Sequence, residues 1–119
     1  MTTPDTGLDG FLASLRRCGL DPVVEAGVVA FTVEPIAGGR VGTAVPTGVG
    51  ADELAGWPAV PPHWVHFPAD VGFAYSNTQP SSKAGWTKHS RQISRWGNAA
   101  EPAQAWLAHV RAIAGEATA

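Results

Sequence analysis

The sequence predicts an α+β fold, in which helices near the two ends of the chain cover one face of an antiparallel sheet. Apolar residues recur at helical spacing after residue 7 and again after residue 101. The segment between them holds valine-rich runs that are bounded by glycine and proline, which is typical of short strands. The 119 residues show no internal repeat, so we expect one domain over residues 1–119.

The first expected element is a short amphipathic helix. Residues 1–7 are polar and are expected to be frayed. Leu8, Phe11 and Leu15 then lie on one helical face, and Gly19, which follows two arginines and a cysteine, is typical of a helix end.

A four-stranded antiparallel meander is expected next. The valine-rich residues 23–33 predict one strand, and a glycine turn at 37–39 leads to a second over 40–45. Residues 46–56 carry three glycines and predict a loop. A third or fourth strand is expected at 64–67, where it is followed by a proline.

A long irregular segment and a closing helix complete the expected fold. Residues 77–85 are polar and prone to turns, and we expect mostly irregular backbone from there to residue 98, held down by tryptophans. Pro102 suits the first turn of a helix, with Glu101 favoured by the helix dipole. Trp106 and Val110 lie on its apolar face, and Gly115 ends it.

Composition and charge exclude several classes of protein. Hydrophobic residues make up 45% of the chain and the net charge is −2, which argues against a sequence-blind nucleic-acid binder. One cysteine cannot form an internal disulfide, and the N-terminus lacks a secretory signal. No apolar run is long enough for a membrane span, so we expect a cytoplasmic protein with no membrane partner.

No metal and no cofactor are expected. His63 and His66 are three residues apart, so on a strand their side chains would point to opposite faces. Zinc requires three or four convergent ligands, and the sequence offers no cysteine or carboxylate pair beside them. The glycines between residues 38 and 56 lack the lysine-serine context of a nucleotide-binding loop.

Two nucleophiles are candidates, and each has a plainer structural interpretation. Cys18 lies beside Arg17, which could lower the pKa of its thiol, yet a lone cysteine on a short helix is more often a small packing residue. Ser90 lies between His89 and Arg91, but neighbours in sequence seldom face one another. Both alternatives stay open on the residues alone.

The central stretch, residues 57–96, holds four of the five tryptophans and resembles a known family. Its front half carries a proline pattern with spaced apolar residues: Trp57-Pro58, Pro61-Pro62, Val65 and Phe67. This pattern is similar to the signature that joins the third and fourth strands of ubiquitin-conjugating enzymes. The order of expected elements from Leu8 to Ala114 matches that fold as well.

The back half resembles a bacterial branch of the same superfamily. Trp86, Ser90, Arg91 and Trp96 look like the tryptophan, serine-arginine and tryptophan pattern of the prokaryotic ubiquitin-conjugating-like family E. Members of this branch lack the usual catalytic cysteine. The resemblance implies two partners, a ubiquitin-like protein and an activating-enzyme-like adenylating protein, with a metallopeptidase that tends to accompany them.

The sequence also departs from the wider family. No cysteine occurs between Val71 and Trp96, which excludes a thioester at the usual position, and the branch's histidine after serine-arginine is Gln92 here. The resemblance therefore implies a transferase that carries its cargo as an oxyester. Ser90 would be the acceptor, and His89 would be its general base.

The remaining roles also follow from the resemblance. Arg91 would stabilise the oxyanion or the cargo's carboxylate through its planar guanidinium. Arg16 and Arg17 would contact the activating partner, and the alternative acceptors are Ser81, Ser82 and Ser94. The competing hypothesis is an inactive module that binds the ubiquitin-like protein or its activating enzyme without covalent chemistry.

Overall fold

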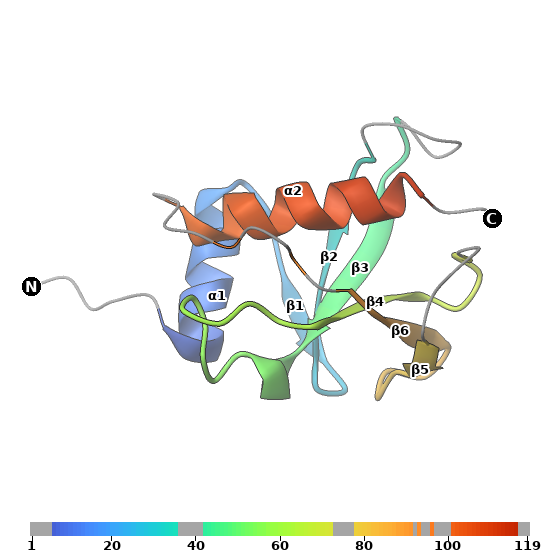
Figure 1. The fold of residues 1–119 in the computed structure, drawn as a ribbon, viewed down its shortest axis with the longest axis horizontal. Helices are drawn as coiled ribbons and strands as arrows, with labels where there is room; N and C mark the ends of the chain where they lie inside the picture. Colours follow the sequence, from blue (N-terminus) through green and yellow to red (C-terminus); the bar gives the residue numbers. More distant parts are fainter. Residues whose placement is uncertain are drawn as a thin grey trace, which may run out of the picture.

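The computed structural model describes residues 6–35, 42–72, 78–91, 93, 96 and 101–116. Its elements confirm the α+β class (Figure 1). The helices are α1 (Gly7–Arg17), α2 (Pro102–Ala114) and the short 3-10 helix η1 (Ala51–Glu53). The strands are β1 (Val23–Glu25), β2 (Val28–Val33), β3 (Val45–Gly50), β4 (Trp64–Pro68), β5 (Thr78–Pro80) and β6 (Trp86–Ser90).

The six strands form one antiparallel sheet in the order β1-β2-β3-β4-β6-β5. The expectation of a four-stranded meander is therefore wrong in strand number. The expectation of irregular backbone over residues 77–98 is wrong at β5 and β6. Strand β6 pairs with β4 on one side and with β5 on the other, so the polar segment extends the sheet.

The valine-rich run of residues 23–33 forms two strands, where one was expected. It divides at Ala26 and Gly27, whose φ angles are +54° and +76°. Two consecutive residues with positive φ are what a tight hairpin turn requires. β1 and β2 then pair in register, with Glu25 opposite Val28.

The glycines after residue 45 belong to a strand, so the loop expected over residues 46–56 is wrong as far as Gly50. A Cβ on Gly48 would lie 2.5 Å from Val28 Cγ1 and 3.0 Å from the Val29 carbonyl oxygen. Gly48 therefore marks a close approach between β3 and β2. Of the strand expected at 40–45, only Val45 lies in β3; residues 36–41 lie outside the described part, as does the expected turn at 37–39.

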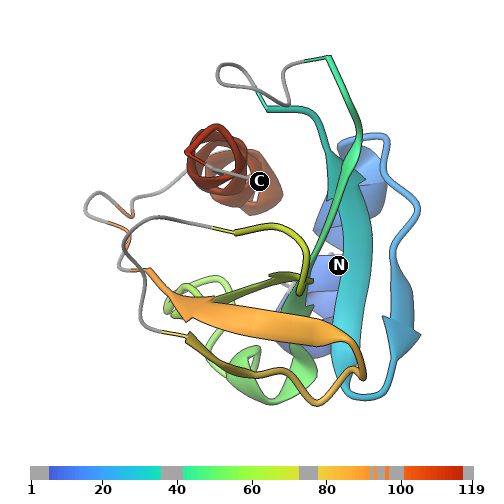
Figure 2. The same cartoon turned by 90° about the vertical axis from the view of Figure 1, so that its right-hand side faces the viewer.

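The sheet bends sharply between β3 and β4. Strands β1, β2 and β3 stand upright in Figure 2, while β4, β6 and β5 extend to their left in the lower half of the view and α2 occupies the corner between the two groups. Gly48 opposite His66 is the single pair of residues that joins β3 to β4 in register. The strand predicted at residues 64–67 is confirmed as β4.

Both helices cover the same face of the sheet, as expected. Helix α1 contributes Phe11 and Leu15, and α2 contributes Trp106 and Val110, to a continuous apolar core. Each such side chain that is fully buried is worth roughly 1.5–3 kcal/mol of transfer free energy. The sheet supplies the other side of the core: Val29, Phe31, Val33, Val45, Val49, Val65 and Phe67.

A polar clamp joins α1 to the start of α2. Arg17 donates from Nε and Nη2 to the two carboxylate oxygens of Glu101, each at 2.8 Å. The Ser14 hydroxyl also donates to Glu101 and accepts the Ala103 N–H at 3.0 Å. Helix α1 begins at Gly7, so that part of the segment expected to be frayed is helical; residues 1–5 lie outside the description.

A second set of polar contacts ties the two hairpin turns together. Ser82 Oγ donates to the Ala26 carbonyl at 2.7 Å, and Lys83 Nζ lies 2.8 Å from Glu25 Oε1. The β5–β6 turn is thereby held against the β1–β2 turn. Within the residues that the structure describes, no helix is long and apolar enough to cross a membrane.

Candidate functional site

The ladder between β4 and β6 divides the candidate residues between two faces of the sheet. Trp64 lies opposite Ser90, and Val65 lies opposite His89. Because successive strand residues point to opposite sides, Ser90 and His89 cannot share a face. We call the side that the helices cover the helix face, and the other side the outer face.

Ser90 meets a histidine that lies next to it in space. Its Oγ forms a hydrogen bond with Nε2 of His63, an exposed residue that immediately precedes β4. The Arg91 N–H donates to the His63 carbonyl at 3.0 Å, which holds the end of β6 against the start of β4. A hydroxyl and an imidazole are thus fixed together at an accessible edge of the sheet.

Glu53 holds the backbone of this histidine. Its Oε1 accepts the N–H of His63 at 3.0 Å and the N–H of Trp64 at 3.2 Å. Burial raises the pKa of the Glu53 carboxyl, and the two N–H donors oppose that shift. The carboxylate therefore positions the main chain of His63, and its contacts are with the backbone, not with the imidazole ring.

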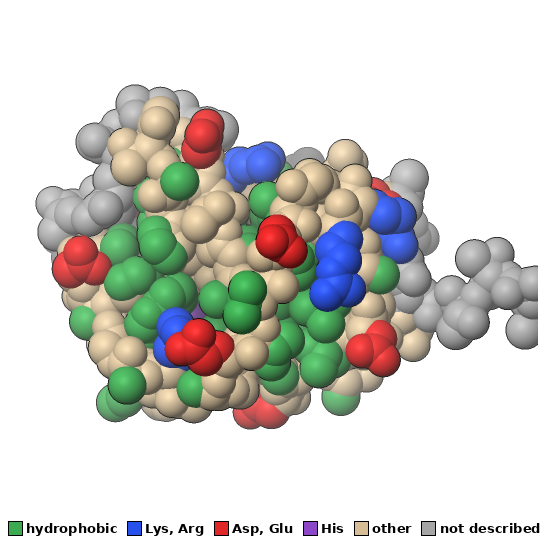
Figure 3. All heavy atoms as spheres, turned by 180° about the vertical axis from the view of Figure 1, so that it is seen from behind, with side chains coloured by type: hydrophobic (Ala, Val, Ile, Leu, Met, Phe, Trp, Pro, Cys, Tyr) green, Lys and Arg blue, Asp and Glu red, His purple; other side chains and the backbone are tan. Residues whose placement is uncertain are grey.

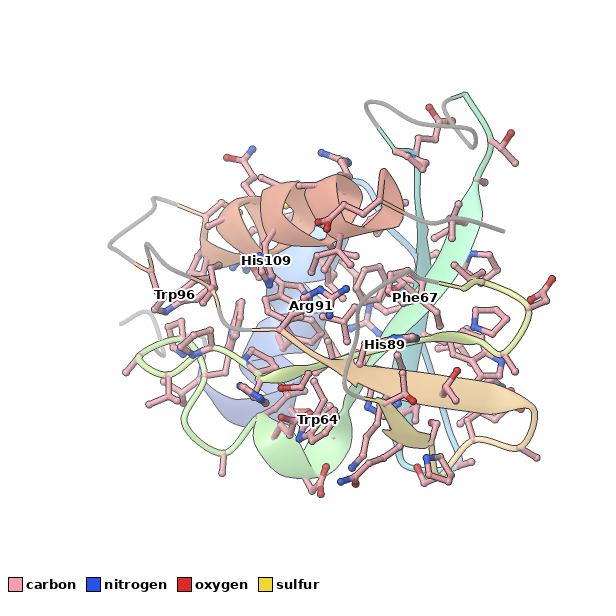
Figure 4. All side chains as sticks on the ribbon, turned by 45° about the vertical axis from the view of Figure 1, so that its right-hand side comes forward. Trp64, Phe67, His89, Arg91, Trp96 and His109 are labelled. Atoms are coloured by element: carbon pink, nitrogen blue, oxygen red, sulfur yellow. The ribbon has the colours of Figure 1, made fainter. Side chains whose placement is uncertain are left out.

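His89 lies on the helix face. Its side chain is 3% exposed, and its ring centroid lies 5.8 Å from that of Phe67 (Figure 4). Burial lowers the pKa of His89, and the charge of Arg91 lowers it further. The structure therefore does not bring His89 to the Ser90 hydroxyl, because strand alternation separates the two side chains.

The guanidinium of Arg91 contacts the main chain of Ser90, whereas it was expected to face the oxyanion or the cargo's carboxylate. Its Nη1 donates to the Ser90 carbonyl at 3.1 Å, and its charge lowers the pKa values of both His89 and His109. Figure 4 shows Arg91 between β6 and His109 of α2. Arg91 thus contacts the main chain of Ser90 from the helix face, whereas the hydroxyl projects from the outer face.

The alternative acceptors differ in accessibility. Ser81 Oγ lies 2.8 Å from Nδ1 of the buried His66 and accepts the Lys83 N–H at 3.1 Å. Ser82 is exposed and is used in the contact between the two turns. Ser94 lies outside the described residues, as does Gln92.

The partner residues predicted on α1 lie in its last turn. Arg16 is exposed, whereas Arg17 is engaged with Glu101 in the clamp between the helices. Burial raises the pKa of the Cys18 thiol, and the charge of Glu101 raises it further, so the lowering expected from Arg17 does not prevail. Cys18 packs partly buried against the core, which favours the structural interpretation of this residue.

The sequence-based hypothesis missed His63 as the partner of Ser90. The two residues are 27 positions apart in the chain, and their proximity depends on the register of β4 against β6. The signal available in the sequence was that His63 immediately precedes one strand and that Ser90 ends the strand that pairs with it. His109 gave no signal in the sequence beyond its place on a helix.

Within the described residues, no group of three or more histidine, cysteine, aspartate or glutamate side chains could hold a metal ion. Comparison of the chain with protein-family models, curated proteins and solved structures found no match. The fold and this site thus define an α+β protein with an accessible Ser90–His63 pair at the junction of β4 and β6.

Proposed function

We propose that the protein is a bacterial ubiquitin-conjugating-like transferase that accepts a ubiquitin-like protein on Ser90, with His63 as the general base. The observation that carries the proposal is the hydrogen bond between Ser90 Oγ and His63 Nε2. A serine hydroxyl is a weak nucleophile until an adjacent base removes its proton. The resemblance of the central stretch to family E supplies the class of substrate and the activating-enzyme-like partner.

The transfer is an acyl exchange. The cargo's C-terminal carbonyl carbon arrives as a thioester on the activating partner, and Ser90 Oγ forms a bond to that carbon. The carbon–sulfur bond breaks, while the hydroxyl proton passes to His63 Nε2 and then to the departing sulfur. In a second step, an amine attacks the ester carbon and gives up a proton to His63 Nε2. The carbon–oxygen bond then breaks as that proton passes to Ser90 Oγ, which restores the hydroxyl.

The surroundings of the pair support this role. His63 is exposed, so a bulky protein C-terminus has access to it, and Glu53 fixes its backbone through two hydrogen bonds. Nε2 accepts the hydroxyl proton when the neutral ring carries its own proton on Nδ1. Arg91 maintains the position of Ser90 through two backbone contacts, to the His63 carbonyl and from Nη1 to the Ser90 carbonyl.

A reconstituted reaction tests the proposal. Purified protein, the activating partner, the ubiquitin-like protein and ATP are expected to give an adduct that hydroxylamine cleaves and that Ser90→Ala abolishes. His63→Asn is expected to slow its formation by about 10²–10⁴-fold, the usual worth of a general base. Ser82→Ala, which removes an exposed hydroxyl away from His63, is the matched control and is expected to leave the adduct unchanged. An adduct that persists in Ser90→Ala would refute the role of Ser90.

A non-covalent binding module is the second candidate. The position of Arg91 favours it, because the guanidinium contacts the Ser90 carbonyl from the helix face and not the side of the sheet where an oxyanion would form. Calorimetry distinguishes the two candidates. Tight binding of the ubiquitin-like protein or its activating enzyme, unchanged by Ser90→Ala and without any adduct, would select the binding module.

A further inference from the structure

A second polar feature lies on the outer face, beside the Ser90–His63 pair. A pocket of about 240 Å³ is lined by residues of β3, η1, β4 and β6 and of the β5–β6 turn: Gly50, Asp52, Glu53, Trp64, His66, Ser82 and Lys88. Its volume suits a small molecule. Of the lining residues, the proposed transfer reaction uses Glu53 alone, through its hydrogen bond to the His63 backbone.

A buried histidine is directed into this pocket. His66 is 3% exposed, and its Nδ1 is bonded to Ser81 Oγ at 2.8 Å. The opposite nitrogen, Nε2, lies at the pocket wall, 3.6 Å from the point where a Cβ on Gly50 would be. Among the described residues no hydrogen-bond partner of Nε2 is seen. Although the His66 side chain as a whole is buried, Nε2 keeps some exposure at the pocket, so a ligand can reach it.

Glycine at position 50 leaves the centre of the pocket open. Asp52 Oδ1 lies 2.7 Å from the same Cβ point, and Glu53 Oε2 lies 3.5 Å from it. Two carboxylate oxygens and one imidazole nitrogen therefore converge on a space that any other side chain would fill. A group that donates several hydrogen bonds and carries positive charge suits this space, as an ammonium does.

Lys88 provides a charge of opposite sign at another part of the wall. Its Nζ lies over the Trp64 ring, 4.9 Å from the centroid. In the described part of the chain, neither Lys88 nor Asp52 takes part in an ion pair, although both line one pocket. The pocket thus offers separate sites for a cationic and an anionic group.

We propose that this pocket binds a small zwitterion, a free α-amino acid, with its ammonium between Asp52, Glu53 and His66 and its carboxylate at Lys88. His66 Nε2 accepts from the ammonium in the tautomer that carries the ring proton on Nδ1, where it is donated to Ser81 Oγ. The neutral form is the one present at pH 7, since burial lowers the pKa of His66 to about 4. This inference goes beyond the proposed transfer activity and does not depend on it.

The test follows the imidazole signals of His66 by ¹H–¹⁵N spectroscopy at pH 7 while L-alanine is added to the full chain. Saturable shifts are expected, with a Kd of about 1 mM. L-alaninamide keeps the ammonium but lacks the carboxylate, and so represents the N-terminus of a peptide. Acetate keeps only the carboxylate. Both are expected to bind at least about tenfold more weakly, the worth of one lost charged contact.

Three variants locate the site. Gly50→Ala places a methyl group among Asp52, Glu53 and His66 and is expected to abolish binding. Gly50 has a φ of −65°, which alanine adopts, and the Asp52 side chain has to move away from the added methyl group. Asp52→Asn is expected to weaken L-alanine and L-alaninamide alike. Lys88→Met is expected to reduce the affinity for L-alanine to that for L-alaninamide.

Asp70→Asn, an exposed carboxylate outside the pocket, is the matched control and is expected to change nothing. The proposal is overturned by the absence of saturable shifts. It is equally overturned if L-alaninamide binds as tightly as L-alanine, or if Gly50→Ala, folded by the same spectrum, binds L-alanine unchanged.

Discussion

His66 is a neutral imidazole held inside a folded sheet. Burial is the main cause of its lowered pKa of about 4; the charges of Lys88 and His89 lower it further, and Asp52 opposes them. A histidine in an unfolded chain titrates near 6.5. Protonation at moderately acid pH is therefore much easier in the unfolded state than in the folded one.

The pH dependence of stability follows from this difference. The contribution of neutral His66 is complete above about pH 6.5 and is lost as the pH falls to about 4, a change of roughly 3 kcal/mol. In urea titrations at pH 7 and pH 4, the wild type is expected to lose more unfolding free energy than His66→Phe. His89 and His109 also have lowered pKa values, and they contribute to the loss of unfolding free energy at acid pH in both proteins. An equal loss in the two proteins would contradict the prediction.

The residue that the sequence could not identify at the site is the base. Ser90 is recognisable because it lies in a motif, and His89 is its neighbour in the chain. Strand alternation places that neighbour on the helix face, and the bond to His63 depends on a strand register that no local pattern encodes. Adjacency in sequence was therefore a poor guide to adjacency in space.

Strand β1 carries exposed apolar residues. Val23 and Val24 of β1 are 55% and 48% exposed. Figure 3 shows hydrophobic side chains gathered in patches between charged ones on the side of the molecule where β1 and β2 lie. Scattered apolar exposure of this extent is ordinary in a folded protein, so the two valines need no special role.

At the scale of single elements, β3 depends on a glycine that permits close packing. Gly48→Ala is expected to lower the unfolding free energy by about 1–3 kcal/mol, because its Cβ would lie 2.5 Å from Val28 Cγ1. Chemical denaturation measures the loss. Val28→Ala in the same chain removes the nearer obstacle, so the double variant is expected to be less destabilised than the two single losses added together. Simple additivity would show that the contact is not the cause.

The same glycines explain which strands could be predicted. The local sequence carries the spacing of apolar residues and the residues typical of element ends for both helices and for the strand at 64–67. These three predicted elements are confirmed. Gly48 and Gly50 suggest a loop when only local sequence is considered, because the reason for Gly48 is the neighbouring strand β2, about 20 residues away in the chain. Strands β5 and β6 are polar and partly exposed, so they exist through pairing and not through hydrophobic alternation.

The clamp between α1 and α2 can be tested separately. Hydrogen bonds from Arg17 and Ser14 lower the pKa of Glu101, so its stabilising effect is present above the ordinary carboxyl pKa and is lost as the pH falls further. Glu101→Gln is expected to cost about 1 kcal/mol at pH 7, since the pair is partly exposed to solvent. Thermal unfolding at pH 7 measures it. Glu116→Gln, at the other end of α2, is the control and is expected to be neutral.

At the scale of the whole molecule, α2 joins the two arms of the bent sheet through a single buried face. Trp106 is fully buried within it. Trp106→Ala is expected to cost about 3–5 kcal/mol, whereas Gln104→Ala on the exposed face of the same helix should stay within about 0.5 kcal/mol. Circular dichroism during urea unfolding measures both variants. Similar losses in the two would show that α2 is not held by this face.

The two edge strands of the sheet affect how readily the protein aggregates at high concentration. β1 and β5 are each three residues long, and β5 ends at Pro80, which has no N–H to offer. An approaching strand would find few backbone groups to pair with at either edge. Short edges of this kind limit the growth of fibrils by edge-to-edge addition, so the exposed valines of β1 form a weak template for aggregation.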